Sequence, residues 1–214
     1  PTITGNAVSM LSGGNTVVVN PHPSGKKVAT EGVRRFNEAI AREIGIDNLI
    51  CVIAEPTLQS AEALFKHRDV ALICVTGGPA VGRAALNSGK RAIVAGPGNP
   101  PVVVDDTANL EAAARDIVAG ASFDNNIICI DEKEVIAIRS VADELIRAMG
   151  RHGAHVLKEH ELRTVERLVF ASMGPPSKPG VLNPRWIGKN AGEIAQAAGV
   201  EVDGDPRLLV AEVP

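Results

Sequence analysis

Residues 70–88, VALICVTGGPAVGRAALNS, contain the pattern that decides the fold of this chain. The run Val70–Thr76 is apolar and predicts a buried strand that ends at Gly77-Gly78. Pro79 then occupies the first turn of a predicted helix that continues to Ser88. A buried strand that passes through glycines into a helix is typical of parallel strands with helical connections.

The same alternation extends on both sides of this stretch. The predicted strands of the first hundred residues are 16–20, 49–53, 70–76 and 91–95, and the predicted helices are 3–11, 26–44, 57–65 and 79–88. After the helix at 3–11, each helix connects one strand to the next, which predicts an open parallel sheet of the α/β class.

The segment 96–101, GPGNPP, interrupts this alternation because its prolines cannot continue regular structure. We therefore expect a first domain over residues 1–98 and a second over 99–214. The second domain is predicted to contain strands at 102–104, 134–138 and 208–211 and helices at 109–121, 141–149, 162–170 and 190–198.

Composition narrows the class of protein. The 214 residues carry a net charge of −3 without a long basic block, which argues against a nucleic-acid or membrane-surface partner. No apolar run reaches the length of a membrane span, and no secretory leader is visible. Three cysteines and scattered histidines predict a reduced, cytoplasmic protein without a metal site.

Two turns are candidate ligand sites: one is rich in glycine, and the other contains a histidine. The segment Gly77–Gly82 can direct backbone N–H groups toward an anion, but it matches neither the dinucleotide nor the P-loop spacing. It is either a nucleotide contact or a tight strand-to-helix turn. His22 follows the first strand and is equally a ligand residue or a turn residue.

Cys129 differs from the other two cysteines. Cys51 and Cys74 lie in apolar runs and are predicted to be buried. Cys129 lies in residues 122–135, SFDNNIICIDEKEV, where the polar residues predict a loop. A thiol in a loop is a candidate nucleophile, although its mostly acidic neighbours do not favour the thiolate. Its activation would therefore need backbone N–H groups or a cofactor.

Three segments together resemble the CoA-acylating aldehyde dehydrogenases: residues 76–82, 95–105 and 121–135. The likeness is to the propionaldehyde and acetaldehyde dehydrogenases of bacterial microcompartments. It is specific over residues 89–135 and weaker over the rest of the chain. The resemblance implies a partial Rossmann-type NAD-binding domain, followed by part of an α/β catalytic domain that carries a cysteine nucleophile.

The resemblance also implies a mechanism. Cys129 would attack the aldehyde to form a thiohemiacetal, which passes hydride to NAD, and coenzyme A would then attack the resulting thioester. Residues implied in cofactor binding are His22, Pro23, Thr76, Gly77, Gly78, Gly82 and Gly96. Among these, Gly77 and Gly82 would let a helix N-terminus approach the pyrophosphate, and the turn at residues 20–24 would meet the adenosine.

Ala95 or Gly96 stands where hydrolytic members of the family carry a glutamate general base. Without that carboxylate to activate water, the thioester is left for coenzyme A. We retain two alternatives: a hydrolytic aldehyde dehydrogenase, and a non-catalytic nucleotide-binding or assembly module.

The ends of the chain bear on its expected activity, and the family resemblance bears on its partners. The chain starts at Pro1 and stops at Pro214, and it is similar to the middle portion of longer family members. The family's oxyanion-binding asparagine and second glutamate would lie outside it, so we expect little dehydrogenase activity from these residues alone. The resemblance implies a homo-oligomer in full-length form and association with a microcompartment shell.

Overall fold

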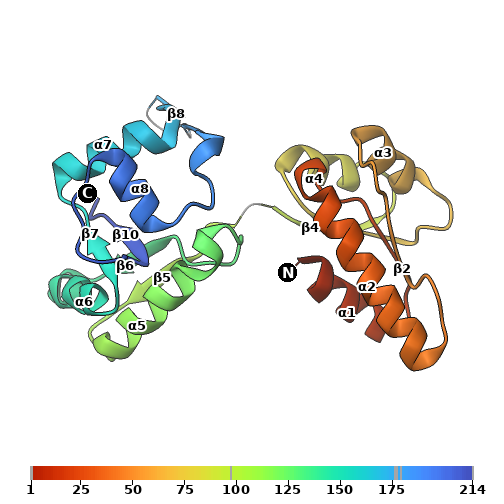
Figure 1. Cartoon of the computed structure of the whole chain (residues 1–214), viewed down its shortest axis with the longest axis horizontal. Helices are drawn as coiled ribbons and strands as arrows, with labels where there is room; N and C mark the ends of the chain where they lie inside the picture. The colour runs from red at the N-terminus through yellow and green to blue at the C-terminus, as the bar shows by residue number, and fades with distance from the viewer. Residues whose placement is uncertain (1, 97, 176–177, 179, 214) are drawn as a thin grey trace. The chain divides into compact units, whose positions relative to one another are not determined.

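The computed structural model describes residues 2–96, 98–175, 178 and 180–213. The chain divides into two compact units, Pro1–Pro97 and Gly98–Pro214. Both units combine helices with pairs of parallel strands (Figure 1), so the predicted α/β class is confirmed. Pro97, within the predicted interdomain segment, lies outside the described residues.

The first unit follows the predicted order of strands and helices. Its elements are α1 (Thr2–Ser12), β1 (Val17–Val19), η1 (Pro23–Gly25), α2 (Lys26–Ile44), β2 (Ile50–Val52), α3 (Leu58–Lys66), β3 (Leu72–Thr76), α4 (Pro79–Leu86) and β4 (Arg91–Ala95).

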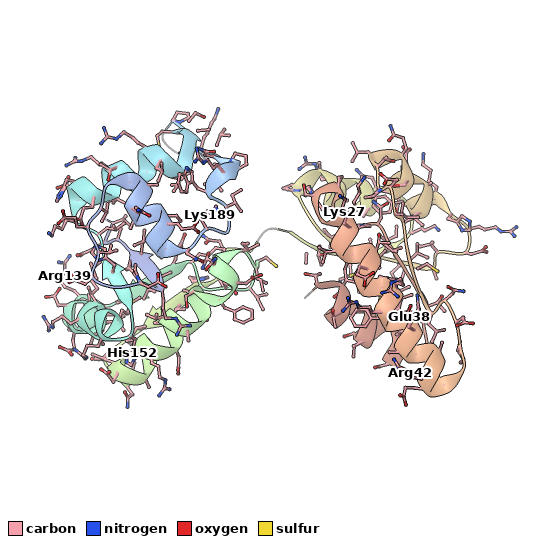
Figure 2. The ribbon with its side chains drawn as sticks, in the orientation of Figure 1. Lys27, Glu38, Arg42, Arg139, His152 and Lys189 are labelled. Carbon is pink, nitrogen blue, oxygen red and sulfur yellow. The ribbon has the colours of Figure 1, made fainter. Side chains whose placement is uncertain are left out.

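Local sequence explains where these helices begin and end. Gly45 adopts φ 69° and ends α2 with a left-handed residue, which glycine tolerates without a Cβ clash. Thr57 caps α3: its side chain accepts the N–H of Ser60, and the Ser60 hydroxyl accepts the N–H of Thr57. Glu38 and Arg42 lie along the exposed side of α2 (Figure 2).

The strands of the first unit form two parallel pairs, β1–β2 and β3–β4. In the described residues these pairs are not hydrogen-bonded to each other, so the single open sheet that we predicted is not present. Helices α1 and α2 pack on one face of β1–β2, and α4 packs on one face of β3–β4. The opposite faces expose apolar side chains, among them Val18, Leu72 and Ile93.

This one-sided covering corrects the prediction for two cysteines. Cys51 is exposed and Cys74 is partly exposed, although both were predicted to be buried. Each side chain alternates with inward-facing neighbours, Ile50 for Cys51 and Ile73 for Cys74, and therefore points to the uncovered face of its strand pair.

The second unit contains more elements than predicted. They are β5 (Pro101–Val104), α5 (Leu110–Ala121), η2 (Phe123–Asn126), β6 (Glu134–Ala137), α6 (Arg139–Arg151), β7 (Ala154–Val156), α7 (Glu159–Val169), β8 (Phe170–Ser172), β9 (Val181–Leu182), η3 (Pro184–Trp186), α8 (Ala191–Ala198) and β10 (Leu208–Val210). The strands β7, β8 and β9 were not predicted, and Phe170 belongs to β8 rather than to the preceding helix.

The second unit has two apolar clusters. Helices α5 and α6 pack on β5–β6 and on one side of β7–β10, around the buried Leu145 and Val118. Helices α7 and α8 pack on the other side of β7–β10, around Ala195 and Leu157. In the described part of the chain, no helix is both long and apolar enough to cross a membrane.

Candidate active site

The loop that carries Cys129 begins directly after α5 and contains three left-handed residues in a row. Asp124, Asn125 and Asn126 have φ angles of 46°, 53° and 60°. Aspartate and asparagine tolerate this backbone region better than most residues with a side chain. The sequence Asp-Asn-Asn thus reverses the chain after α5 and leads it toward β6.

Side-chain amides hold this loop in place. Asn126 Nδ2 donates to the carbonyl oxygens of Ala121 at 2.7 Å and Glu132 at 3.0 Å, which ties the two ends of the loop together. Asn125 Nδ2 donates to the Gly188 carbonyl at 3.0 Å and to Asn190 Oδ1 at 2.8 Å. The second pair of bonds fixes the loop to the segment before α8.

Glycines let the surrounding backbone approach the loop closely. A Cβ on Gly98 would overlap the carbonyl oxygen of Cys129, and a Cβ on Gly120 would overlap the carboxylate of Glu132. Gly188, at φ 74°, faces Ile127 in the same way. A larger residue at Gly98 would displace the backbone of the Cys129 loop, whereas at Gly120 or Gly188 it would displace the side chain of Glu132 or Ile127.

Asp131 and Lys133 bond to the peptide groups beside Cys129. Asp131 is only 4% exposed, and its carboxylate accepts the N–H of Ile128 at 3.0 Å. Lys133 Nζ donates to the carbonyl oxygens of Ile128 at 3.0 Å and Asp131 at 3.2 Å. The Cys129 side chain itself is exposed, as predicted for a residue in a loop.

The loop is also joined to the segment before β5. The backbone N–H of Lys133 donates to the Pro100 carbonyl at 3.2 Å, and Asn99 Nδ2 donates to Glu134 Oε1 at 2.6 Å. Because β5 and β6 are parallel, both connections lie at the amino end of the strand pair. Cys129 is therefore an exposed thiol on a well-anchored turn, which suits a nucleophile.

The predicted cofactor residues all belong to the first unit. Thr76 ends β3, and Gly77 and Gly78 lead into α4, where Gly78 is the N-cap and supplies no side-chain cap. In the described part of the chain, the N–H groups of Ala80 and Val81 in the first turn of α4 have no hydrogen-bond partner. Such open amides fit the phosphates of a dinucleotide.

Gly82 has a structural reason for being glycine. It is buried in α4, and a Cβ there would lie 2.8 Å from Cγ1 of Val94 in β4. Gly82 therefore permits close helix–strand packing, and its approach to a pyrophosphate stays a prediction. Gly96 directly follows β4, and a Cβ there would meet no atom within 4 Å.

His22 forms a turn after β1. Its Nδ1 accepts the N–H of Ser24 at 3.2 Å and caps η1, which starts at Pro23. The turn interpretation therefore has a direct contact in its favour, whereas the adenosine contact stays a prediction for both His22 and Pro23.

Sequence reasoning missed several polar contacts. Lys26, at the start of α2, pairs with Glu55, which follows β2. Ser60 Oγ donates to Asn20 Oδ1 at 2.6 Å, so the cap of α3 also holds the turn after β1. Asn20 and Glu55 lie at or just after the carboxyl ends of predicted strands, and that position was the available signal. No group of three metal-ligating side chains occurs among the described residues.

Comparison with known proteins decides the family. The model of the aldehyde dehydrogenase family matches residues 2–163. This chain belongs to that family. An acetylating acetaldehyde dehydrogenase from Bilophila wadsworthia is 44% identical over 99% of this chain and 44% of its own length. The chain thus spans less than half the length of the curated relatives that it matches.

Solved aldehyde dehydrogenases have the same fold. A propionaldehyde dehydrogenase from a Clostridium phytofermentans fucose-utilisation bacterial microcompartment superposes with a TM-score of 0.87 at 41% identity, covering 98% of this chain and 47% of that one. A Rhodopseudomonas palustris propionaldehyde dehydrogenase with bound CoA and an acylated cysteine gives 0.86 at 39% identity, covering 98% and 46%.

A related structure contains a nicotinamide cofactor. An engineered glycolyl-CoA reductase with bound NADP+ superposes with a TM-score of 0.86 at 40% identity, covering 98% of this chain and 46% of that one. Members of this family therefore bind NADP+ and CoA, and at least one belongs to a microcompartment. The predicted resemblance to acylating aldehyde dehydrogenases is confirmed.

Proposed function

We propose that the protein containing this chain oxidises propanal or acetaldehyde to the corresponding acyl-CoA, with Cys129 as nucleophile and NAD as hydride acceptor. The observation that carries the proposal is the exposed Cys129 on an anchored loop of an aldehyde dehydrogenase chain. The first unit would bind the dinucleotide, and the second would supply the nucleophile.

The residues of the second unit support acyl transfer through Cys129. Its Sγ would bond to the aldehyde carbon, and the carbonyl oxygen would take up the displaced electron pair and then a proton. Bound NAD would supply the oxidising chemistry by accepting hydride. The resulting thioester would be cleaved when the CoA sulfur attacks the acyl carbon and the Cys129 thiolate leaves.

Residues at the ends of β3 and β4 support two further parts of the proposal: binding of the dinucleotide, and transfer of the acyl group to CoA rather than to water. The open amides at the start of α4, together with Thr76, Gly77 and Gly78, would hold the pyrophosphate. Ala95 and Gly96 provide no carboxylate to activate water at the position where hydrolytic members carry one. The acyl group is therefore expected to pass to CoA rather than to water.

The test compares NADH formation with and without CoA. It uses the longest gene product that contains this chain, beside variants Cys129→Ala and Cys51→Ala. We expect CoA-dependent NADH formation that Cys129→Ala abolishes. The matched control Cys51→Ala removes another exposed thiol and should retain full activity.

The same experiment separates the alternatives. Acid formation at full rate without CoA would identify a hydrolytic enzyme instead. Intact NAD binding, with no aldehyde-dependent label on Cys129, would identify a non-catalytic nucleotide-binding or assembly module. Replacing NAD by NADP in the assay tests the cofactor preference.

We also propose a homo-oligomer that works in the cytoplasm within a microcompartment. The support is the microcompartment origin of the Clostridium phytofermentans relative. Co-purification of the full-length protein with shell particles would be expected, and a protein found only in the particle-free fraction would contradict this assignment.

A further inference from the structure

Lys133 and Asp131 both bond to Ile128, the residue that precedes the nucleophile. The Ile128 carbonyl accepts two bonds, one from Lys133 Nζ at 3.0 Å and one from the Asp131 N–H at 3.1 Å. The Ile128 N–H in turn donates to the Asp131 carboxylate at 3.0 Å. Both sides of Ile128 are therefore fixed by charged side chains.

These contacts act on the N–H of Cys129. The Ile128 carbonyl and the Cys129 N–H belong to one peptide group, so a positive charge on the carbonyl withdraws electrons from the N–H. Hydrogen bonds in a chain polarise one another in this way, and charged donors have the larger effect. Among the described residues, the Cys129 N–H has no hydrogen-bond partner.

We propose that Lys133 is a positioning residue that orients and polarises the Cys129 N–H to stabilise a negative oxygen on an acyl group attached to Cys129. When the thiolate attacks a carbonyl carbon, the S–C bond forms and the carbonyl electron pair moves to oxygen. The N–H donates to that oxygen until the carbonyl re-forms and the leaving group departs. The proposal rests on the proposed role of Cys129 as nucleophile.

Asp131 has the complementary part. Its buried carboxylate holds the N–H of the peptide group before Ile128, and its backbone N–H donates to the carbonyl of the peptide group after Ile128, which Lys133 also contacts. Lys133 also donates to the Asp131 carbonyl at 3.2 Å, so both residues form one clamp. Since Asp131 is buried, its replacement would disturb the fold, and Lys133 is the better position for a test.

The test compares two reactions of the Cys129 thiol that differ in the charge on oxygen. Acylation by p-nitrophenyl acetate forms a negative oxygen and releases p-nitrophenolate, whereas alkylation by iodoacetamide proceeds at a saturated carbon without one. Neither reaction needs NAD, CoA or an aldehyde. Both are followed at Cys129 by peptide mass spectrometry, which separates it from the exposed Cys51.

We expect Lys133→Met to slow acylation about tenfold, less than the loss of a whole oxyanion donor, and to leave alkylation within about twofold. Lys133→Arg keeps the cation and should restore much of the acylation rate. Equal slowing of both reactions, or no slowing of either, would overturn the proposal. So would a wild-type chain that is alkylated at Cys129 but not acylated.

The same data are independent of the proposed overall reaction. If the Lys133 variants change the acylation rate of Cys129 as expected while the full-length protein does not oxidise aldehydes, the proposed acyl-CoA formation is wrong. The proposed role of Lys133 is then retained. Circular dichroism and the urea midpoint of Lys133→Met show that the variant is folded. A variant that unfolds is replaced by Lys133→Gln, whose shorter side chain retains a polar donor without the charge.

Discussion

The position of Asn126 requires both a left-handed backbone and a side-chain hydrogen-bond donor, and few residues provide both. Its backbone is left-handed, with φ 60°, and its side-chain amide donates to Ala121 and Glu132. Glycine would satisfy the first demand but not the second, and alanine would satisfy neither. The Cys129 loop therefore depends on this asparagine for both its backbone path and its closure.

We predict that Asn126→Ala lowers the free energy of unfolding by about 2 kcal/mol, because it loses two hydrogen bonds and places a Cβ in a left-handed conformation. Asn126→Gly also loses the two hydrogen bonds, but glycine tolerates the left-handed backbone, so the free energy of unfolding should fall by less than in Asn126→Ala. Urea denaturation of both variants measures the difference. If the alanine variant were as stable as the wild type, the loop would not depend on these contacts.

Gly98 restricts where the loop that carries Cys129 can lie. Because a Cβ on Gly98 would overlap the Cys129 carbonyl, Gly98→Ala must displace the loop. We predict that acylation of Cys129 by p-nitrophenyl acetate falls at least about tenfold, as expected for a misplaced reacting group. The control Gly150→Ala adds a Cβ with no atom within 4 Å, and it should leave acylation unchanged.

At the scale of elements, an ion-pair group joins the ends of α5 and α6. Glu111 accepts from Arg151 Nη2 at 2.7 Å and lies 2.8 Å from His152 Nε2, and Arg151 also approaches Glu144 at 3.3 Å. His152 lies at the end of α6 (Figure 2). Hydrogen bonds from Arg151 and then from His152 lower the pKa of Glu111 below its ordinary value of 4.5.

We predict a pH-dependent contribution from Glu111. A carboxyl group with a lowered folded-state pKa stabilises the fold fully above pH 4.5 and loses that effect as pH falls through its folded pKa. Glu111→Gln should therefore reduce Tm at pH 7 by about 1–3 °C, because exposed pairs contribute little, and the difference should shrink below pH 4.5. Calorimetry across pH measures it.

The control for this pH dependence is Glu201→Gln, at an exposed position without an ion pair in the described part of the chain. It should change Tm little at any pH. A Tm difference between wild type and Glu111→Gln that persists unchanged at pH 3 would show that Glu111 does not act through its charge.

The cap of α3 offers a second prediction at this scale. Thr57→Ala removes the acceptor of the Ser60 N–H, and loss of an N-cap typically costs about 1 kcal/mol. Urea denaturation should show that loss in the transition of the first unit. Thr30→Ala, within α2 and without a hydrogen bond from its hydroxyl in the described residues, should be neutral or slightly stabilising.

Helices with strong local signals could be predicted closely, whereas the short strands β7, β8 and β9 could not. The bounds of α2 agree with the prediction because an amphipathic pattern extends along the helix and Gly45 determines its C-terminal end. β7 has three residues and pairs with the distant β10, and β9 has only two residues, which pair with the neighbouring β8. The Lys133–Ile128 contact also escaped prediction, because backbone carbonyls leave no mark in a sequence.

For the molecule as a whole, the covering of strand faces is uneven. β7–β10 has apolar clusters on both sides, whereas β5–β6 is covered on one side. On its other side Val103 is 72% exposed and Ile136 is 56% exposed. Parallel strands are normally covered on both faces, so an open apolar face of this kind marks a surface that associates.

We predict that Val103→Lys reduces association of the purified 214-residue chain and changes its free energy of unfolding by less than about 0.5 kcal/mol, because the side chain is exposed. Light scattering and dye binding to apolar surface measure the first effect, and urea denaturation measures the second. The matched control is Val104→Lys, one residue further along β5, whose side chain is 2% exposed and which should prevent folding.

The same substitution tests what covers this face in a longer protein. Relatives that match this chain are more than twice its length. If the additional segments of a full-length protein cover β5–β6, Val103→Lys should destabilise that protein by several kcal/mol while leaving the 214-residue chain unaffected, since only the former would bury the charge. An equally small effect in both would show that this face stays open in the whole molecule.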